Sequence, residues 1–280
     1  YIQTDIRLYS QRENNFSWNE NRLDLKLEAS PSEGAHIYSE LWLRGYGFPE
    51  VTTSSELMQR GKDRVSPWGL IFREAYLDLY GFLLSDLDVR IGRQRIAWGT
   101  ADKLNPTDNL NPDDLDDVWD FGRHLGSNAI KASYYLGDYT LTTVFIPLFT
   151  PSALPTKDWA QALSPPMELP PGLTLRYLSD SIVTPEDNLK KSSMAAFKVA
   201  KNLLGYDLSL SYLYGRDDLA LVRSVKFTPV DTLGTIDVSL ELIYPQMQVV
   251  GLDMAGAIGK VGIWTEGATF FPEKVELTTD

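Results

Sequence analysis

Cysteine is absent from the 280-residue sequence, and histidine occurs only as His36 and His124. The lack of cysteine excludes disulfide scaffolds, cysteine-ligated zinc, iron–sulfur clusters and thiol catalysis. No run of about 18 or more apolar residues occurs, so no membrane-spanning helix is expected. Bases are also in the minority, because 26 Lys and Arg stand against 38 Asp and Glu for a formal net charge of −12. Nucleic acid is therefore not expected as a partner, since it favours basic surfaces.

What the sequence does contain is alternation of apolar and polar residues at period two. The clearest case is Arg22–Ala29, where every second residue is Leu or Ala and the residues between are Asp24, Lys26 and Glu28. Such alternation is typical of a β-strand with one apolar and one polar face. The pattern extends over residues 2–9, 22–29, 35–46, 72–82, 87–98, 128–136, 139–146, 194–201, 207–214, 220–228, 235–244, 248–257 and 260–271.

The connections between these strands alternate between tight turns and long loops. Gly137-Asp138 is typical of a tight hairpin turn, whereas 48–67, 99–127 and the proline-rich 147–191 are long. Transmembrane β-barrels combine short turns at one end with long loops at the other. The sequence therefore predicts one all-β domain over 1–280, an antiparallel up-and-down transmembrane β-barrel of about 12–14 strands. Aromatic residues near strand ends, among them Trp68 and Trp98, fit the aromatic girdles at a membrane interface.

In a membrane barrel the polar faces of these strands would line the lumen. Arg90, Arg93 and Arg95 form a basic ladder that we expect to face Glu74, Asp78 and the acidic loop that follows. Glu40 and Arg44 lie in a further polar row. Basic and acidic walls that face each other across a pore form a selectivity filter. Structural salt bridges that fix the loop after residue 98 are an equally good interpretation.

The loop that follows is strongly acidic. Its candidate site residues are Asp108, Asp113, Asp114, Asp116 and Asp117. Carboxylate oxygens at this density are ligands that Ca²⁺ accepts, which makes Asp113, Asp114 and Asp116 a candidate calcium site. The spacing does not fit an EF-hand, because the bend glycine and the bidentate Glu are missing. A solvated acidic loop and a lumenal constriction that repels anions are the alternatives.

The sequence gives little support for catalysis. His36 and His124 are the only histidines that could serve as a base for a Ser-His-acid hydrolase, and neither lies near a GxSxG nucleophile elbow. No GxxxxGK[ST] phosphate loop occurs. We therefore expect no enzyme activity and no cofactor other than the candidate calcium.

Two blocks of sequence carry a family resemblance. The first block comprises REAYLDLYG, VRIGRQRIAWGTAD and LNPTDNLNPDDL, and the second is VVGLDMAGAIGKVGIWTEGA. Together they resemble uncharacterised, porin-like outer-membrane β-barrels of bacteria, often encoded near resistance-nodulation-division exporters. The match is specific over about residues 70–150 and weaker over 249–270. It implies a barrel with the NPTD loop folded toward the lumen, and it implies no substrate. Such barrels commonly end on an aromatic residue. This sequence ends on Leu277-Thr278-Thr279-Asp280, which leaves open that it is a truncated part of a larger barrel.

The function expected from these observations is passive transport across a bacterial outer membrane. The chain would be a porin-like channel or an export accessory for small solutes or lipidic substrates, with 147–191 over its mouth. Its expected partners are outer-membrane lipid and envelope transport proteins. Two alternatives are a structural barrel subunit of a larger envelope complex and a soluble all-β carbohydrate-binding module.

Overall fold

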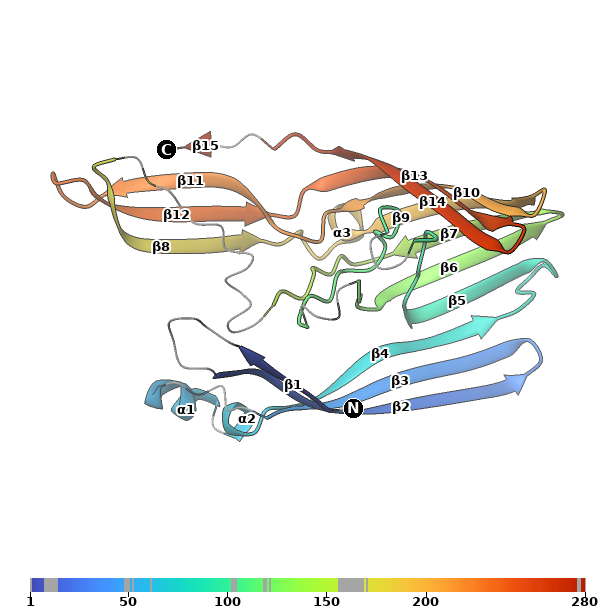
Figure 1. Ribbon diagram of the computed structural model, residues 1–280, viewed down its shortest axis with the longest axis horizontal. Coiled ribbons are helices and arrows are strands. Elements are labelled where there is room, and N and C mark those ends of the chain that lie inside the picture. The colour runs from blue at the N-terminus through green and yellow to red at the C-terminus, as the bar shows by residue number, and fades with distance from the viewer. Residues whose placement is uncertain are drawn as a thin grey trace.

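The computed structural model describes most of the chain. The described residues are 2–7, 15–47, 51, 53–60, 62–101, 105–117, 120, 122–155, 169, 171–275 and 278–279. Eleven strands form the main sheet, in the order β1-β2-β3-β4-β5-β6-β7-β9-β10-β13-β14, and all neighbours are antiparallel (Figure 1). Their bounds are β1 Ile2–Arg7, β2 Asn15–Ser32, β3 Ala35–Tyr46, β4 Trp68–Leu79, β5 Leu87–Gln94, β6 Ser127–Leu136, β7 Tyr139–Ile146, β9 Met194–Leu203, β10 Tyr206–Arg216, β13 Gln246–Ile258 and β14 Val261–Pro272.

The strands are joined by tight turns at one end of the sheet and by long connections at the other, as the sequence predicts (Figure 1). The tight turns use residues with positive φ, which the twist of a hairpin requires. Gly137 has φ 58° in the β6–β7 turn, and Leu204 and Gly205 have φ 55° and 84° in the β9–β10 turn. The long connections lie between β3 and β4, β5 and β6, β7 and β9, and β10 and β13.

A second sheet of four strands extends beyond the long-connection end. It consists of β8 Thr174–Val183, β11 Leu221–Pro229, β12 Thr235–Ile243 and β15 Thr278–Thr279, in the order β15-β11-β12-β8. The sequence predicts β11 and β12 as strands but places them in the barrel, and it misses β8. They lie outside the main sheet because β10 pairs directly with β13 as far as Arg216 and Gln246. Instead β12 pairs in parallel with β8, which links two long connections.

Helices in the described part of the chain are few and short. The predicted loop 48–67 contains α1 Ser54–Arg60 and α2 Lys62–Val65, and α3 Leu189–Ser192 precedes β9. Asn188 caps α3 by accepting hydrogen bonds from the N–H groups of Lys190 and Lys191, which is the usual role of Asn at this position. Within the described ranges, no helix is both long and apolar enough to cross a membrane.

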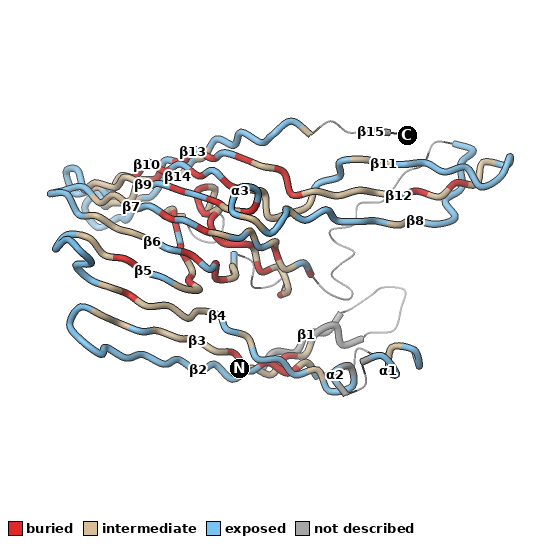
Figure 2. Tube along the Cα trace, turned by 180° about the vertical axis from the view of Figure 1, so that it is seen from behind, coloured by how far each residue is buried: buried red, intermediate tan, exposed pale blue. Residues whose placement is uncertain are grey.

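On the main sheet, apolar side chains are exposed and several charged side chains are buried, which is the reverse of the arrangement in a soluble protein. Apolar side chains on the convex face are exposed, for example Leu27 at 61% and Leu252 at 62%. Several charged side chains on the concave face are buried, with Glu20 at 0% and Asp78 at 6%. Figure 2 shows the buried residues gathered in the middle of the molecule, where the sheet curves around interior segments. The charged face is therefore the inside of this fold.

The two edges of the main sheet differ from its interior. β1 pairs with β2 only as far as Asn21, so β2 beyond that residue has no partner on its outer edge among the described residues. β14 likewise pairs only with β13 in the part of the chain that the structure describes. Within the described strands, the main sheet is therefore not closed by pairing between its own edges.

Gly92 provides a test of how the sheet is built. It has φ 131°, and an added Cβ would lie 2.4 Å from the Ala75 carbonyl oxygen. We expect Gly92→Ala to destabilise the fold by about 1–3 kcal/mol, because both the backbone strain and the clash must be relieved. Thermal unfolding followed by circular dichroism in detergent measures this. Gly69→Ala is the matched control, since its Cβ would meet nothing within 4 Å. Equal midpoints for the two variants would contradict the prediction.

Candidate functional site

The concave face of β3, β4 and β5 carries a network of paired charges. Arg90 donates two hydrogen bonds to Asp78, of 2.6 and 3.0 Å, and His36 Nδ1 lies 3.5 Å from the same carboxylate. The Arg90 guanidinium also stacks 3.8 Å from the centre of the Tyr76 ring, a cation–π arrangement. Each charged group in this row therefore has a partner on the neighbouring strand.

A second group surrounds Trp42, further toward the long-connection end. The guanidinium groups of Arg22 and Arg73 lie 3.9 and 4.2 Å from the centre of the indole ring. The indole N–H donates to Glu40 (2.9 Å), which also accepts from the Tyr38 hydroxyl (2.9 Å). Trp42 thus fixes two positive charges on the concave face.

Residues 95–101 and 105–117, which we call the interior segment, run along this face. Two of its aspartates bind arginines of the sheet: Asp114 accepts from Arg73 (2.9 Å) and Asp116 accepts from Arg44 (2.9 Å). Within the segment, Arg95 donates to both carboxylate oxygens of Asp108. Charge-assisted pairs of this kind are the stronger hydrogen bonds in proteins. The pairs with Arg73 and Arg44 fix the interior segment to β4 and β3.

At the opposite edge of the main sheet, Glu266 of β14 holds the interior segment. Its carboxylate accepts hydrogen bonds from the backbone N–H groups of Thr100 (2.8 Å), Ala101 (3.0 Å) and Thr107 (2.9 Å), and from the Thr107 hydroxyl (2.7 Å). The Thr107 side chain packs on Gly251, where an added Cβ would lie 2.5 Å from Thr107 Cγ2. The interior segment therefore bridges the inside of the curved sheet from β14 to β3.

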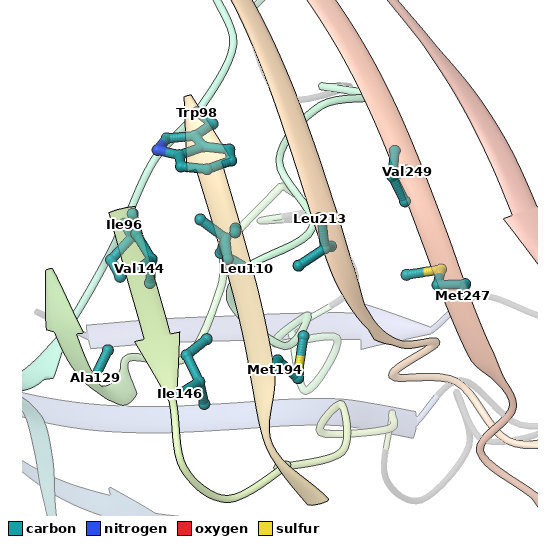
Figure 3. Close-up of a cluster of buried hydrophobic side chains, with 11 residues drawn as sticks. Ile96, Trp98, Leu110, Ala129, Val144, Ile146, Met194, Leu213, Met247 and Val249 are labelled. Atoms are coloured by element: carbon teal, nitrogen blue, oxygen red, sulfur yellow. The ribbon is translucent and has the colours of Figure 1, made fainter. Parts of the chain in front are cut away.

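The apolar side of the interior segment forms the core of the molecule. Ile96, Trp98 and Leu110 pack against inward-facing residues of β6, β7, β9, β10 and β13, with Leu110 only 2% exposed (Figure 3). Trp98, which the sequence places in an interfacial girdle, is buried here because β5 ends at Gln94 and the chain turns inward. Trp68, by contrast, is exposed on the convex face, and its place in an interfacial girdle stays a prediction.

Most of the predicted pore-lining residues share the concave face. Glu40, Arg44, Glu74, Asp78, Arg90 and Arg95 all contribute to the networks there, and Glu74 accepts a hydrogen bond of 2.8 Å from the Arg95 N–H.

The expectation that Arg93 joins this wall is wrong. Arg93 pairs with Ala75 and Asn128, and the adjacent pairs on that face are Ile91 with Leu77 and with Ile130. Residues that face each other in an antiparallel pair point to the same side of the sheet, so Arg93 lies on the convex face.

The acidic residues of the interior segment do not converge. Asp108, Asp114 and Asp116 bind different arginines, Asp113 lies 3.1 Å from His124 Nδ1, and Asp117 is buried. Among the described residues, no group of three or more His, Asp or Glu side chains could hold a metal ion. Asp113, Asp114 and Asp116 therefore do not form the shared oxygen cage that the calcium hypothesis needs.

Several important contacts are not evident from the sequence pattern. Arg73 is missed because the sheet has an irregularity between Glu40/Leu41 and their partners on β4, so that Arg73 and Glu74 both turn inward. Asp218 is missed because it comes from the β10–β13 connection, where it accepts from the Asp113 N–H (2.7 Å) and the Ser152 hydroxyl (2.5 Å). A regular alternation of apolar and polar residues indicates neither the contacts of Arg73 nor those of Asp218.

A cavity of about 240 Å³ lies between the interior segment and the ends of β7, β9 and β10. Its lining includes Asp113, His124, Phe149, Arg216 and Asp218. Burial raises the pKa of the Asp113 carboxyl, and the negative charge of Asp218 raises it further. The cavity thus combines apolar walls with several charged side chains.

Comparison with known proteins adds little to this description. The chain matches no family model and no curated protein sequence. Among solved structures it is similar to OmpTdeltaL8, the loop L8 deletion mutant of OmpT, an outer membrane protein of Vibrio cholerae. The TM-score is 0.39 and the identity is 13%, over 96% of this chain and 68% of that one. The fold described above rests on the strand pairing itself.

Glu266 provides a test of how the interior segment is held. Glu266→Gln places an amide donor among backbone N–H donors, so we expect the segment to open more often. A lost charge-assisted hydrogen bond of about 1.5–3 kcal/mol corresponds to amide exchange at least about tenfold faster over 99–101 and 105–107. Hydrogen exchange with mass spectrometry measures this, and Glu28→Gln, at an exposed carboxylate of β2, is the control. Unchanged exchange in Glu266→Gln would contradict the assignment.

Acidification should release the interior segment because it protonates the Asp114 carboxylate. Burial alone would raise the pKa of the Asp114 carboxyl, but Arg123 and Arg73 outweigh burial and hold that pKa below its ordinary value. A carboxyl with a depressed folded-state pKa contributes stability above about pH 4, and this contribution is lost as pH falls through the folded-state value. Protection against amide exchange over 111–117, taken relative to the intrinsic exchange rate at each pH, should therefore fall below about pH 4.

Asp114→Asn should flatten this pH response, because the ionisable group is removed. The pKa shift of Asp113 has the opposite sign. Because its pKa is raised in the folded state, protonation of Asp113 on acidification favours the folded state. Asp113→Asn is therefore the informative control. If Asp114→Asn keeps the pH profile of the unmodified chain, the pairing of Asp114 with Arg73 and Arg123 is not what holds the interior segment at neutral pH.

Proposed function

We propose that the chain is the wall of a bacterial outer-membrane β-barrel and works as a porin-like channel for small solutes. Transport is passive, and we assign no catalytic residue and no cofactor. The observation that carries the proposal is the reversed burial of the main sheet, with Leu, Ile and Phe exposed on the convex face and charged side chains turned inward. Barrels that face lipid have this arrangement.

The convex face is too apolar for a surface in contact with water. Rows of exposed apolar residues run over neighbouring strands, among them Leu23, Leu25, Leu43, Leu70, Phe72, Ile91, Ile130, Phe145, Phe197, Leu210 and Val250. Monomeric soluble proteins rarely expose apolar patches beyond a few hundred Å². This disfavours the soluble carbohydrate-binding module. In a bilayer the same rows contact lipid tails.

The strands and their edges also fit a membrane setting. Strands such as β3, with 12 residues, and β9, with 10, match the roughly 9–11 residues that cross a bilayer at a tilt. Unpaired backbone groups are not tolerated in the hydrocarbon region. The free edges of β2 and β14 would therefore be paired in the working protein, by each other or by further strands of a larger barrel.

The interior segment would determine which solutes could pass through the lumen. It bridges the inside of the sheet near the long-connection end, where it would narrow the lumen. The inner face of β2 carries Asp24, Lys26 and Glu28 outside this bridged region, and the Lys26 side chain is 56% exposed. Water-filled passages lined by both signs of charge suit small polar solutes.

A structural barrel subunit is the second candidate function. It is favoured by the apolar core between the interior segment and β7, β9 and β10, which fills one side of the lumen. A lumen that is filled elsewhere as well would not conduct. Association with envelope transport proteins would belong to this candidate or to an export accessory.

Recordings in planar lipid bilayers test the channel directly. We expect the purified chain to require detergent and to give stepwise ion conductance. Lys26→Gln removes a positive charge from the lumen, so the reversal potential in a salt gradient should shift toward cation preference. Lys201→Gln is the matched control. Lys201 pairs with Tyr139 and Leu208 on the convex face, and its loss should leave the reversal potential unchanged.

Insertion into the bilayer without conductance would support the structural subunit. A chain that stays monodisperse in plain buffer and does not insert would contradict the membrane assignment altogether. Equal shifts for Lys26→Gln and Lys201→Gln would contradict the assignment of the concave face as the lumen.

A further inference from the structure

Arg93 is a cation on the convex face, among residues that would contact lipid. Its partners in the sheet are Ala75 on β4 and Asn128 on β6, and Asn128 is exposed on the same side. The next pairs along the strands put Ile91 and Ile130 beside it, 43% and 46% exposed. A positive charge on an apolar, lipid-facing surface is costly unless something compensates for it.

No protein group supplies that compensation among the described residues. The Nε atom of Arg93 is buried and makes no hydrogen bond, and no carboxylate of the described chain forms an ion pair with Arg93. Arginines of the concave face differ, since Arg44, Arg90 and Arg95 each bind an aspartate. No hydrogen bond or ion pair from the described residues therefore occupies the Arg93 guanidinium.

The side chain is nevertheless held in a definite place. Its stem packs over Gly126, where an added Cβ would lie 3.2 Å from Arg93 Cγ. Arg93 is the second-last residue of β5 and Asn128 is the second of β6, so both lie at the long-connection end of these strands. In barrels of the outer membrane this end faces the outside of the cell, which places the guanidinium toward the outer leaflet.

We propose that Arg93, with the amide of Asn128, binds a phosphate group of a membrane lipid in the outer leaflet. The planar guanidinium presents paired N–H donors that match two phosphate oxygens, and the apolar residues on either side contact the acyl chains. A long arginine side chain can reach the headgroup level from within the apolar belt. This inference rests on the proposed membrane function and adds a specific lipid site to it.

Native mass spectrometry of the detergent-solubilised chain tests the site. The probes are lipid A with its phosphates, lipid A after enzymatic removal of the phosphates, phosphatidylglycerol and inorganic phosphate. We expect Arg93→Gln, whose side chain still covers Gly126, to bind phosphorylated lipid A about tenfold more weakly than the unmodified chain. Arg93→Lys should recover part of the affinity, because it keeps the charge without the planar donor pair.

The control is Lys226→Gln, which removes one positive charge from the exposed surface of β11 in the second sheet. It should leave lipid A binding unchanged. Dephosphorylated lipid A should not distinguish Arg93→Gln from the unmodified chain, since the discriminating contact is to phosphate. Comparable binding of phosphatidylglycerol would assign the site to lipid phosphates in general, and binding of phosphorylated lipid A alone would assign it to phosphorylated glycolipids.

Two results would overturn the inference. The first is equal affinity of Arg93→Gln and the unmodified chain for every phosphate-bearing lipid. The second is a change of oligomeric state in Arg93→Gln with lipid binding intact, which would assign Arg93 to a contact between copies. Either result is separable from failure of the proposed function, because detergent dependence and insertion into bilayers are measured on the same preparations without reference to Arg93.

Discussion

Paired charges inside the curved sheet are the feature on which the rest of this structure depends. Asp114 with Arg73, Asp116 with Arg44, and Glu266 with three backbone N–H groups hold the interior segment across the concave face. Removing one partner of a buried pair leaves an uncompensated charge, at a cost of about 3–5 kcal/mol. The interior segment and the sheet around it therefore need each other: without the segment, Arg44 and Arg73 would lose these partners.

This arrangement also explains where the apolar residues go. A curved single sheet has only one concave side, and in this protein polar contacts occupy much of it. Apolar packing is confined to the region where Leu110 and Trp98 meet β7, β9, β10 and β13. The remaining apolar side chains project from the convex face, where a lipid environment would stabilise them. Inner charge and outer apolarity are thus two consequences of one arrangement. Arg93 and Lys201 are exceptions on the convex face, and of these two Lys201 contacts Tyr139.

Strand bounds can be predicted from local sequence patterns, whereas contacts between distant residues cannot. β3 and β7 have the predicted bounds, because alternation and turn residues are local signals. The faces on which Arg73 and Arg93 lie depend on where an irregularity in strand pairing occurs. A one-residue irregularity on β4 turns Arg73 inward beside Glu74, whereas β5 pairs without a shift through Gly92, so that Arg93 stays on the face of Ile91. A single slip in register moves side chains to the other face, and nothing in the composition marks where the slip occurs.

The sequence by itself determined the all-β class, the alternation of tight turns with long connections and the separation of charged from apolar faces, because each is encoded within a few neighbouring residues. Only the tertiary structure decided that β11 and β12 leave the main sheet to pair with β8, that the acidic residues bind separate arginines, and that the interior segment crosses from β14 to β3. These features join residues far apart in the chain, such as Thr100 and Glu266, and a contact at that separation depends on how the whole sheet curves.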